Sequence, residues 1–181
     1  MNKLSKLPND ITRLRGFTLI LTEDRARTSI TELIAKEILS SPLFVIAASE
    51  WLPAYKLTHA IRKKTLEVRS ALDRLYTVRS STCYRLFDSL ANIPSKGEPI
   101  LVLDFLHTFY DDDIPLRVRF FKLRQCCRQL KRLSFYRPVI GTTQEMQTEA
   151  YEKFIPALRS IADRTLNLES EPEQISQPEL L

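Results

Sequence analysis

Short apolar runs alternate with stretches of helical periodicity along most of this chain. Continuous apolar runs are typical of strands buried on both faces, whereas apolar residues three and four positions apart are typical of a helix with one buried face. Strands are therefore predicted at residues 17–21, 43–48, 75–78, 100–103, 138–142 and 164–168. Helices are predicted at residues 28–39, from Pro53 onward, through 84–90, at 116–130 and at 154–161. This alternation predicts βαβ units and a mostly parallel sheet, an α/β fold.

Two of these segments carry the clearest patterns. The run 100–103 is continuously apolar and ends in Asp104, as expected for a central parallel strand with an acid at its carboxyl end. The helix that follows has one apolar stripe, formed by Leu116, Phe120, Leu123, Cys127 and Leu130. Its remaining faces are basic.

The composition is that of one globular domain. A chain of 181 residues with 44% hydrophobic and 27% charged residues is long enough to bury a core. We divide it into an N-terminal extension (1–15), a core domain (16–168) and an acidic tail (169–181). The tail is rich in Glu, Pro, Gln and Ser, and this composition predicts disorder.

The cysteines and the hydropathy favour a soluble protein of a reducing compartment. The three cysteines, Cys83, Cys126 and Cys127, fit neither a disulfide framework nor a zinc ligand set. No apolar run approaches the roughly 20 residues that a membrane helix needs. The lysines near the N-terminus are not followed by a long hydrophobic stretch. We therefore expect a cytoplasmic protein with no membrane partner.

The positive charge is concentrated in one segment. The net charge is +5, and because the tail holds four glutamates and no Lys or Arg, the rest of the chain is more basic still. Residues 114–137 contain eight Lys or Arg residues and no acid. One helical face carries Arg117, Arg124, Arg128 and Lys131, so several phosphates could be contacted together. This pattern favours a nucleic acid as partner, although a protein with an acidic face could use the same helix.

Polar residues follow four of the predicted strands. They are the segment 21–28 (Leu-Thr-Glu-Asp-Arg-Ala-Arg-Thr), the segment 47–50 (Ala-Ala-Ser-Glu), Asp104, and the segment 142–144 (Thr-Thr-Gln). In open parallel sheets ligands bind beyond the carboxyl ends of the strands. We therefore expect these residues to converge at one edge of the sheet.

The order and spacing of these segments resemble the ATPase core of RecA-type recombinases, over nearly the whole chain from Gly16 to Glu169. The resemblance implies a single-domain RecA-like P-loop NTPase fold with ATP and Mg²⁺ as cofactors. It implies that 21–28 is the phosphate loop and that Glu50 is the catalytic residue that activates water. The residues implied to bind nucleotide are Arg27, Thr28, Asp104 and Gln144, with Thr28 and Asp104 at the Mg²⁺ ion.

The same resemblance adds Arg119 to the candidate nucleic-acid contacts. In RecA-like proteins the loop after the strand that ends in the acid is one of two DNA-binding loops, here roughly residues 107–119. This loop also holds Asp111, Asp112 and Asp113, which argue against simple phosphate binding there. With Arg119 added to the four residues of the helical face, the predicted nucleic-acid contacts are Arg117, Arg119, Arg124, Arg128 and Lys131.

The sequence departs from the family at the phosphate loop. Leu21 and Ala26 stand where the loop has glycines, and Arg27 stands where it has lysine. Glycine lets backbone N–H groups wrap phosphates without interference from a Cβ atom. Glu23 and Asp24 also place carboxylates where phosphate oxygens would lie, a repulsion of roughly a kcal/mol or more. We therefore expect ATP hydrolysis to be lost.

The expected function is that of a RecA-like accessory protein in DNA recombination or repair, which binds DNA or a RecA-like partner subunit or associates with itself. Other interpretations stay open for single residues, because Glu50 could be a solvated residue at a strand end and Asp104 could brace a turn. Three other functions also stay open: a residual ATP-binding NTPase, a structural partner that uses another subunit's nucleotide, and a signalling relative similar to KaiC.

Overall fold

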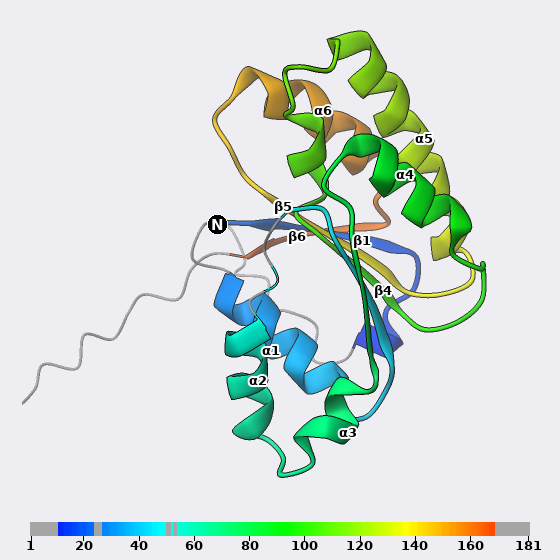
Figure 1. Ribbon diagram of the computed structural model, residues 1–181. Helices are drawn as coiled ribbons and strands as arrows, with labels where there is room; N and C mark the ends of the chain where they lie inside the picture. The colour runs from blue at the N-terminus through cyan, green and yellow to red at the C-terminus, as the bar shows by residue number, and fades with distance from the viewer. Residues whose placement is uncertain (1–10, 24–26, 50–51, 53, 169–181) are drawn as a thin grey trace, which may run out of the picture.

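The structure is a computed structural model, which describes residues 11–23, 27–49, 52 and 54–168 (Figure 1). Glu50, most of the N-terminal extension and the acidic tail lie outside the described residues. The predicted disorder of the tail therefore stays a prediction.

The core is one six-stranded sheet in which every pairing is parallel. The strands are β1 (Phe17–Thr22), β2 (Leu43–Ala47), β3 (Leu75–Arg79), β4 (Ile100–Leu103), β5 (Val139–Gln144) and β6 (Arg164–Leu168). Their order across the sheet is β3-β2-β4-β5-β1-β6. The predictions of an α/β fold and of neighbouring parallel strands at β1, β2, β4 and β5 are confirmed.

Helices cover both faces of the sheet (Figure 1). One face carries α1 (Arg27–Glu37), α2 (Ala54–Arg62) and α3 (Val68–Leu72), which connect β1 to β2 and β2 to β3. The opposite face carries α4 (Cys83–Asn92), α5 (Leu116–Ser134) and α6 (Glu149–Ile161). The chain reverses its direction across the sheet after β3. Because crossovers between parallel strands share one hand, this reversal moves the later helices to the other face.

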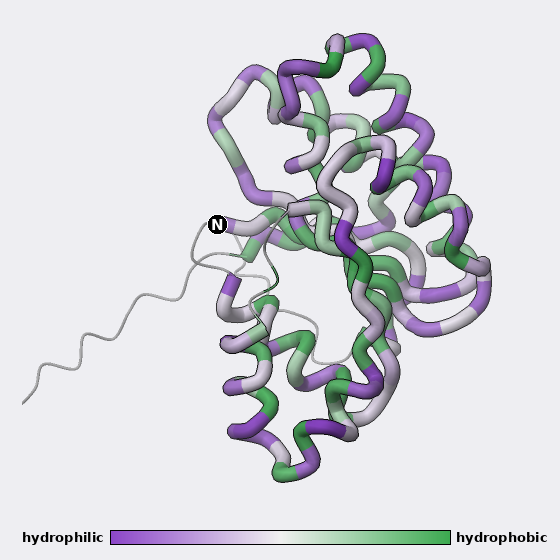
Figure 2. Tube along the Cα trace, in the orientation of Figure 1, coloured by the Kyte–Doolittle hydropathy of each residue, from purple (hydrophilic) through white to green (hydrophobic). Residues whose placement is uncertain are grey.

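The strands at the centre of the sheet are buried on both sides. All residues of β1 and β4 are buried. Phe17, Leu19 and Leu21 of β1 join the core on the α5 side, whereas Ile20 joins the core on the α1 side. Figure 2 shows apolar residues concentrated along the sheet, with hydrophilic residues on the outer turns of the helices. Each fully buried Leu, Ile or Phe side chain contributes about 1.5–3 kcal/mol, so this double layer supplies most of the driving force for folding.

The packed domain extends to the N-terminal side of Gly16. A short 3-10 helix, η1 (Ile11–Arg13), buries Ile11 completely, and Leu14 is buried beside it. The backbone N–H of Ile11 donates to Oε2 of the buried Glu37 at 3.2 Å. Ile11 and Leu14, which lie in the predicted N-terminal extension, therefore belong to the core. Among the described residues, no helix is long and apolar enough to cross a membrane.

Gly141 provides a test of the packing between adjacent central strands. A Cβ atom at this position of β5 would lie 3.0 Å from Cε2 and 3.1 Å from Cζ of the buried Phe17 ring. We expect Gly141→Val to lower the free energy of unfolding by about 1–3 kcal/mol, because extra volume in a packed core forces neighbours to shift. Urea unfolding measures this change. The control is Thr77→Val on the exposed edge strand β3, which should stay within about 0.5 kcal/mol of the parent. Equal stability of the two variants would contradict the packing described.

Candidate functional site

The carboxyl ends of β1, β4 and β5 meet at one edge of the sheet. There Arg27, Asp104 and Gln144 line a small cavity, together with His107, Tyr110, Thr143 and Met146. The structure thus brings together three of the four residues predicted to bind nucleotide. The chain leaves β1 and the adjacent β5 towards opposite faces, which is the arrangement that forms ligand crevices in open α/β sheets. The cavity itself measures about 30 Å³, roughly the volume of one water molecule.

Asp104 links three strands at this edge. It has a left-handed backbone conformation, with φ 51° and ψ 46°, and is the only non-glycine residue with positive φ in the described part of the chain. Its backbone N–H donates to Oγ1 of Thr142 at 3.0 Å. Its carboxylate accepts a hydrogen bond of 2.6 Å from the hydroxyl of Ser49. Because these partners lie at the ends of β5 and β2, Asp104 braces the edge of the sheet.

The start of the predicted phosphate loop is part of a strand. Leu21 and Thr22 are the last residues of β1, and they pair with Thr143 and Gln144 on one side and with Asn167 and Leu168 on the other. Their backbone groups therefore face neighbouring strands instead of an open loop. Residues 24–26 of the predicted loop lie outside the described residues.

The remaining predicted nucleotide and metal residues are less well placed or not described. Thr28 is exposed in the first turn of α1 and is not among the residues that line the cavity. Glu50 is outside the described residues. Within the described part of the chain, no group of three or more His, Cys, Asp or Glu side chains could hold a metal ion. The Mg²⁺ site at Thr28 and Asp104 stays a prediction.

Tyr110 also belongs to this edge, although it was not among the residues predicted there. Burial raises the pKa of the Tyr110 phenol well above its usual value, the nearby Tyr151 adds to the rise, and Thr143 partly offsets it. The phenol is therefore neutral at physiological pH. Only the tertiary contact between η3 (Phe105–Phe109), which precedes Tyr110, and β5 brings it to the cavity, so no local sequence pattern indicates it.

A second candidate site is the outer face of α5. Arg117, Arg124 and Arg128 are exposed there, and none of them forms an ion pair or hydrogen bond with the described part of the chain. Phe121 lies on the same face between two of these arginines, with 58% of its surface exposed. Positions 117, 121, 124 and 128 follow steps of four, three and four, so they form one stripe along the helix. Phe121 was not among the predicted contacts, although its spacing of four residues from Arg117 places it on the same helical face.

The other basic residues of α5 have structural partners. Arg119 is only 7% exposed, and its guanidinium donates to the carbonyl of Phe109 at 3.2 Å and to Asp112 at 3.0 Å. Lys131 is half-exposed and forms an ion pair of 2.7 Å with Asp163. Arg119 is therefore not part of the exposed stripe, because its charge holds the loop before α5 in place. Lys131 lies on the stripe, but its charge is paired with that of Asp163.

No protein-family model matches this sequence, and no curated protein matches it. The RecA-type family therefore stays a prediction that rests on the order of the motifs.

The bracing role of Asp104 can be separated from a role in metal binding. Asp104→Ala should lower the free energy of unfolding by about 1–3 kcal/mol, because alanine disfavours the left-handed conformation and cannot accept the hydrogen bond from Ser49. Asp104→Asn should cost clearly less, since asparagine tolerates this conformation and keeps an acceptor oxygen. Urea unfolding without metal or nucleotide measures both. If Asp104→Ala is as stable as the parent, the bracing role is wrong.

Proposed function

We propose that this protein is a RecA-like accessory module of DNA recombination or repair, which binds nucleic acid along the outer face of α5 and does not hydrolyse ATP. The observation that carries the proposal is the stripe of Arg117, Arg124 and Arg128, which are exposed and have no partner within the described residues.

The strand order of this sheet differs from the orders of the two common doubly wound folds. In both the dinucleotide-binding order 3-2-1-4-5-6 and the flavodoxin-like order 2-1-3-4-5, β1 lies beside β2. Here β1 lies between β5 and β6, and β2 is two strands away from β5. This order brings the end of β5 between those of β1 and β4, so that Gln144 joins Arg27 and Asp104, the residues that carry the family resemblance.

The same edge supports the loss of ATP hydrolysis. A triphosphate needs several free backbone N–H groups at a helix N-terminus, and β1 already pairs Leu21 and Thr22 with both neighbouring strands. The cavity among Arg27, Asp104 and Gln144 has the volume of about one water molecule, far below that of a nucleotide. The described side chains of the predicted site thus line a space that is too small for a nucleotide.

The stripe on α5 suits a polyanion. Arg117 and Arg128 are eleven residues apart, about 16 Å along the helix, a length that spans several phosphates of a nucleic-acid strand. No acidic residue occurs in α5, so nothing on the helix itself neutralises the stripe. The inner face of the helix is anchored by Leu123, Cys127 and Leu130, which are buried against the sheet. The arginines are therefore held on a rigid support.

A partner protein is the second candidate, and a different surface favours it. The edge strand β3 has exposed side chains over most of its length, and Tyr76 is 48% exposed. Tyr76 and Val78 line an open groove of about 460 Å³ with Phe44, Ile93 and Pro94 among its other residues. An exposed apolar edge strand is a template for pairing with another chain, so this surface fits a partner subunit or a second copy of this chain.

The proposal predicts that charge reversal on α5 removes nucleic-acid binding. We expect Arg117→Glu, Arg124→Glu and Arg128→Glu together to abolish binding to a 20-base-pair duplex at low salt. In the parent, binding should fall steeply with salt, by roughly 0.9 power of the salt concentration for each phosphate neutralised. Fluorescence anisotropy across a salt series measures both effects.

The matched control reverses three exposed cations on the opposite face, Lys56, Arg62 and Lys63. It changes the net charge by the same amount and should keep most of the binding. Both triple variants should unfold within about 1.5 kcal/mol of the parent, because exposed charges contribute less than about 0.5 kcal/mol each. If the parent does not bind, or if the α5 variant binds as well as the parent, nucleic-acid binding by α5 is refuted and the partner protein becomes the leading candidate.

The proposal also predicts weak or absent ATP binding. Titration calorimetry of the full chain with Mg²⁺ and ATP should show no saturable binding at micromolar concentrations. If a small heat of binding is measured and is unchanged in Arg27→Ala, the nucleotide binds outside the candidate edge. Submicromolar affinity, with turnover that Asp104→Ala abolishes, would refute the loss of ATPase function and favour the residual NTPase.

A further inference from the structure

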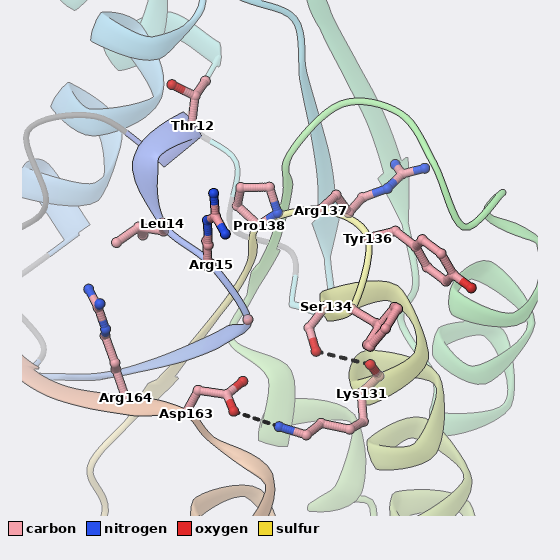
Figure 3. A pocket seen from close by; sticks show the side chains of 12 residues that line it. Thr12, Leu14, Arg15, Lys131, Ser134, Tyr136, Arg137, Pro138, Asp163 and Arg164 are labelled. Atoms are coloured by element: carbon pink, nitrogen blue, oxygen red, sulfur yellow. Dashed lines mark hydrogen bonds and ion pairs between the residues drawn. The ribbon is translucent and has the colours of Figure 1, made fainter.

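A large open cleft lies at the opposite edge of the sheet from the candidate nucleotide site (Figure 3). Its volume is about 800 Å³. The residues that line it come from the segments just before β1, β5 and β6 and from the C-terminal end of α5: Thr12, Leu14, Arg15, Gly16, Lys131, Ser134, Phe135, Tyr136, Arg137, Pro138, Asp163 and Arg164. The length of β1, about 20 Å, separates it from the cavity at Asp104, so the two sites are independent.

The cleft is strongly basic. It is lined by four cations, Arg15, Lys131, Arg137 and Arg164, and by one acid, Asp163. The carboxylate of Asp163 is already engaged, since it accepts hydrogen bonds from Lys131 at 2.7 Å and from the backbone N–H of Phe17 at 2.8 Å. These two contacts, Lys131 first, hold the pKa of Asp163 below its usual value. The carboxylate is therefore charged and paired, and it leaves an excess of positive charge.

Two of the four cations have no partner among the described residues. The buried guanidinium of Arg137 is engaged, because it donates to the carbonyls of Pro94, Ser95 and Glu98. Arg15 and Arg164 are exposed and form no hydrogen bond or ion pair with the described part of the chain. In Figure 3 their side chains lie on one side of the cleft. They are the groups available to an anion.

Exposed aromatic rings form the other part of the lining. Phe135 is 83% exposed and Tyr136 is 52% exposed, with their ring centroids 5.0 Å apart at an angle of 76°. In Figure 3 Tyr136 lies on the other side of Pro138 from Arg15 and Arg164, and its ring extends away from them. Neighbouring large aromatic side chains that are this exposed cost free energy in water. A cleft lined by both exposed cations and exposed aromatic rings matches a ligand that carries phosphates and flat rings.

The cleft also continues the stripe on α5. Lys131 follows Arg128 by three positions and Phe135 follows Lys131 by four, so the face of Arg117, Phe121, Arg124 and Arg128 runs along the helix into the cleft. A small anion would contact the cleft alone. An extended polyanion would contact both the exposed arginines of the helix and those at the sheet edge.

We propose that this cleft anchors an unpaired segment of a nucleic-acid strand, with phosphates on Arg15 and Arg164 and a base stacked on Tyr136 or Phe135. This inference rests on the proposed function, and it adds a second binding site and a preference for single strands. The α5 stripe supplies a sequence-independent electrostatic contact, whereas the cleft supplies the contact that only an unpaired base can make.

The experiment compares a single-stranded 20-mer of deoxythymidine with a 20-base-pair duplex, by fluorescence anisotropy on the full chain at low salt. The cleft variant is Arg15→Glu with Arg164→Glu, and its charge-matched control is Lys56→Glu with Lys63→Glu on the far face. We expect the cleft variant to lose at least tenfold in affinity for the single strand and the control to lose less than twofold. Circular dichroism and urea unfolding establish that each variant is folded. The milder pair Arg15→Gln with Arg164→Gln serves if the reversal does not fold, and it should lose at least threefold.

The aromatic contact is tested by Phe135→Ala with Tyr136→Ala. Because stacking contributes only when a base is unpaired, this pair should lower affinity for the single strand by about tenfold and change duplex affinity less than twofold. An equal loss for both ligands, or no loss, overturns the stacking.

The outcomes separate the inference from the proposed function. Normal single-strand binding by a folded cleft variant, with loss in the α5 triple variant, overturns the cleft and leaves the proposed function intact. Loss in the cleft variant with normal binding by the α5 variant supports the cleft and overturns the role of α5. A parent chain that binds neither ligand overturns both.

Discussion

Most of this structure depends on the burial of both faces of the central strands β1, β4 and β5. A parallel sheet buried on both faces requires helices on each side, and the reversal of the chain after β3 provides them. The same arrangement places the carboxyl ends of the central strands at one edge and their amino ends at the other. Both candidate ligand sites at the sheet edges are consequences of this packing, and they are separated by the length of a strand.

The helix α5 shows how one basic sequence serves two purposes. Lys122 lies over the rings of Tyr84 and Phe87, and Arg132 donates to the carbonyls of Leu90 and Ile93. These cations connect α5 to α4 and to the segment before β4. Arg117, Arg124 and Arg128, on the outer face of the helix, are exposed and have no such partner among the described residues. The charge that we propose to bind nucleic acid is thus the charge that α5 does not use in packing.

The two edges of the sheet differ in a way that follows from their side chains. At the carboxyl edge, Asp104 accepts a hydrogen bond from Ser49 and donates one to Thr142, and the cavity that the described residues line there measures about 30 Å³. At the amino edge, Gly16 adopts φ 78°, and the segment before β1 and the end of α5 both line an open basic cleft. A ligand at the first edge would have to displace internal hydrogen bonds, whereas a ligand at the second would meet unpaired arginines. This difference favours the amino edge as the binding surface.

The sequence by itself determined the elements and the fold class, because the burial of a strand or helix face leaves a periodic pattern in the chain. The predicted strand at 100–103 matches β4, and the predicted apolar stripe of α5 is largely the face that packs on the sheet. Local pattern also indicated which polar residues end the central strands. It could not show that Arg119 is buried with Asp112, or that Arg15, Arg164 and Tyr136 line one cleft, because these residues are distant in the chain and periodicity carries no information about such contacts. Only the tertiary structure decided which cations are paired and which are available, since that depends on what each helix packs against.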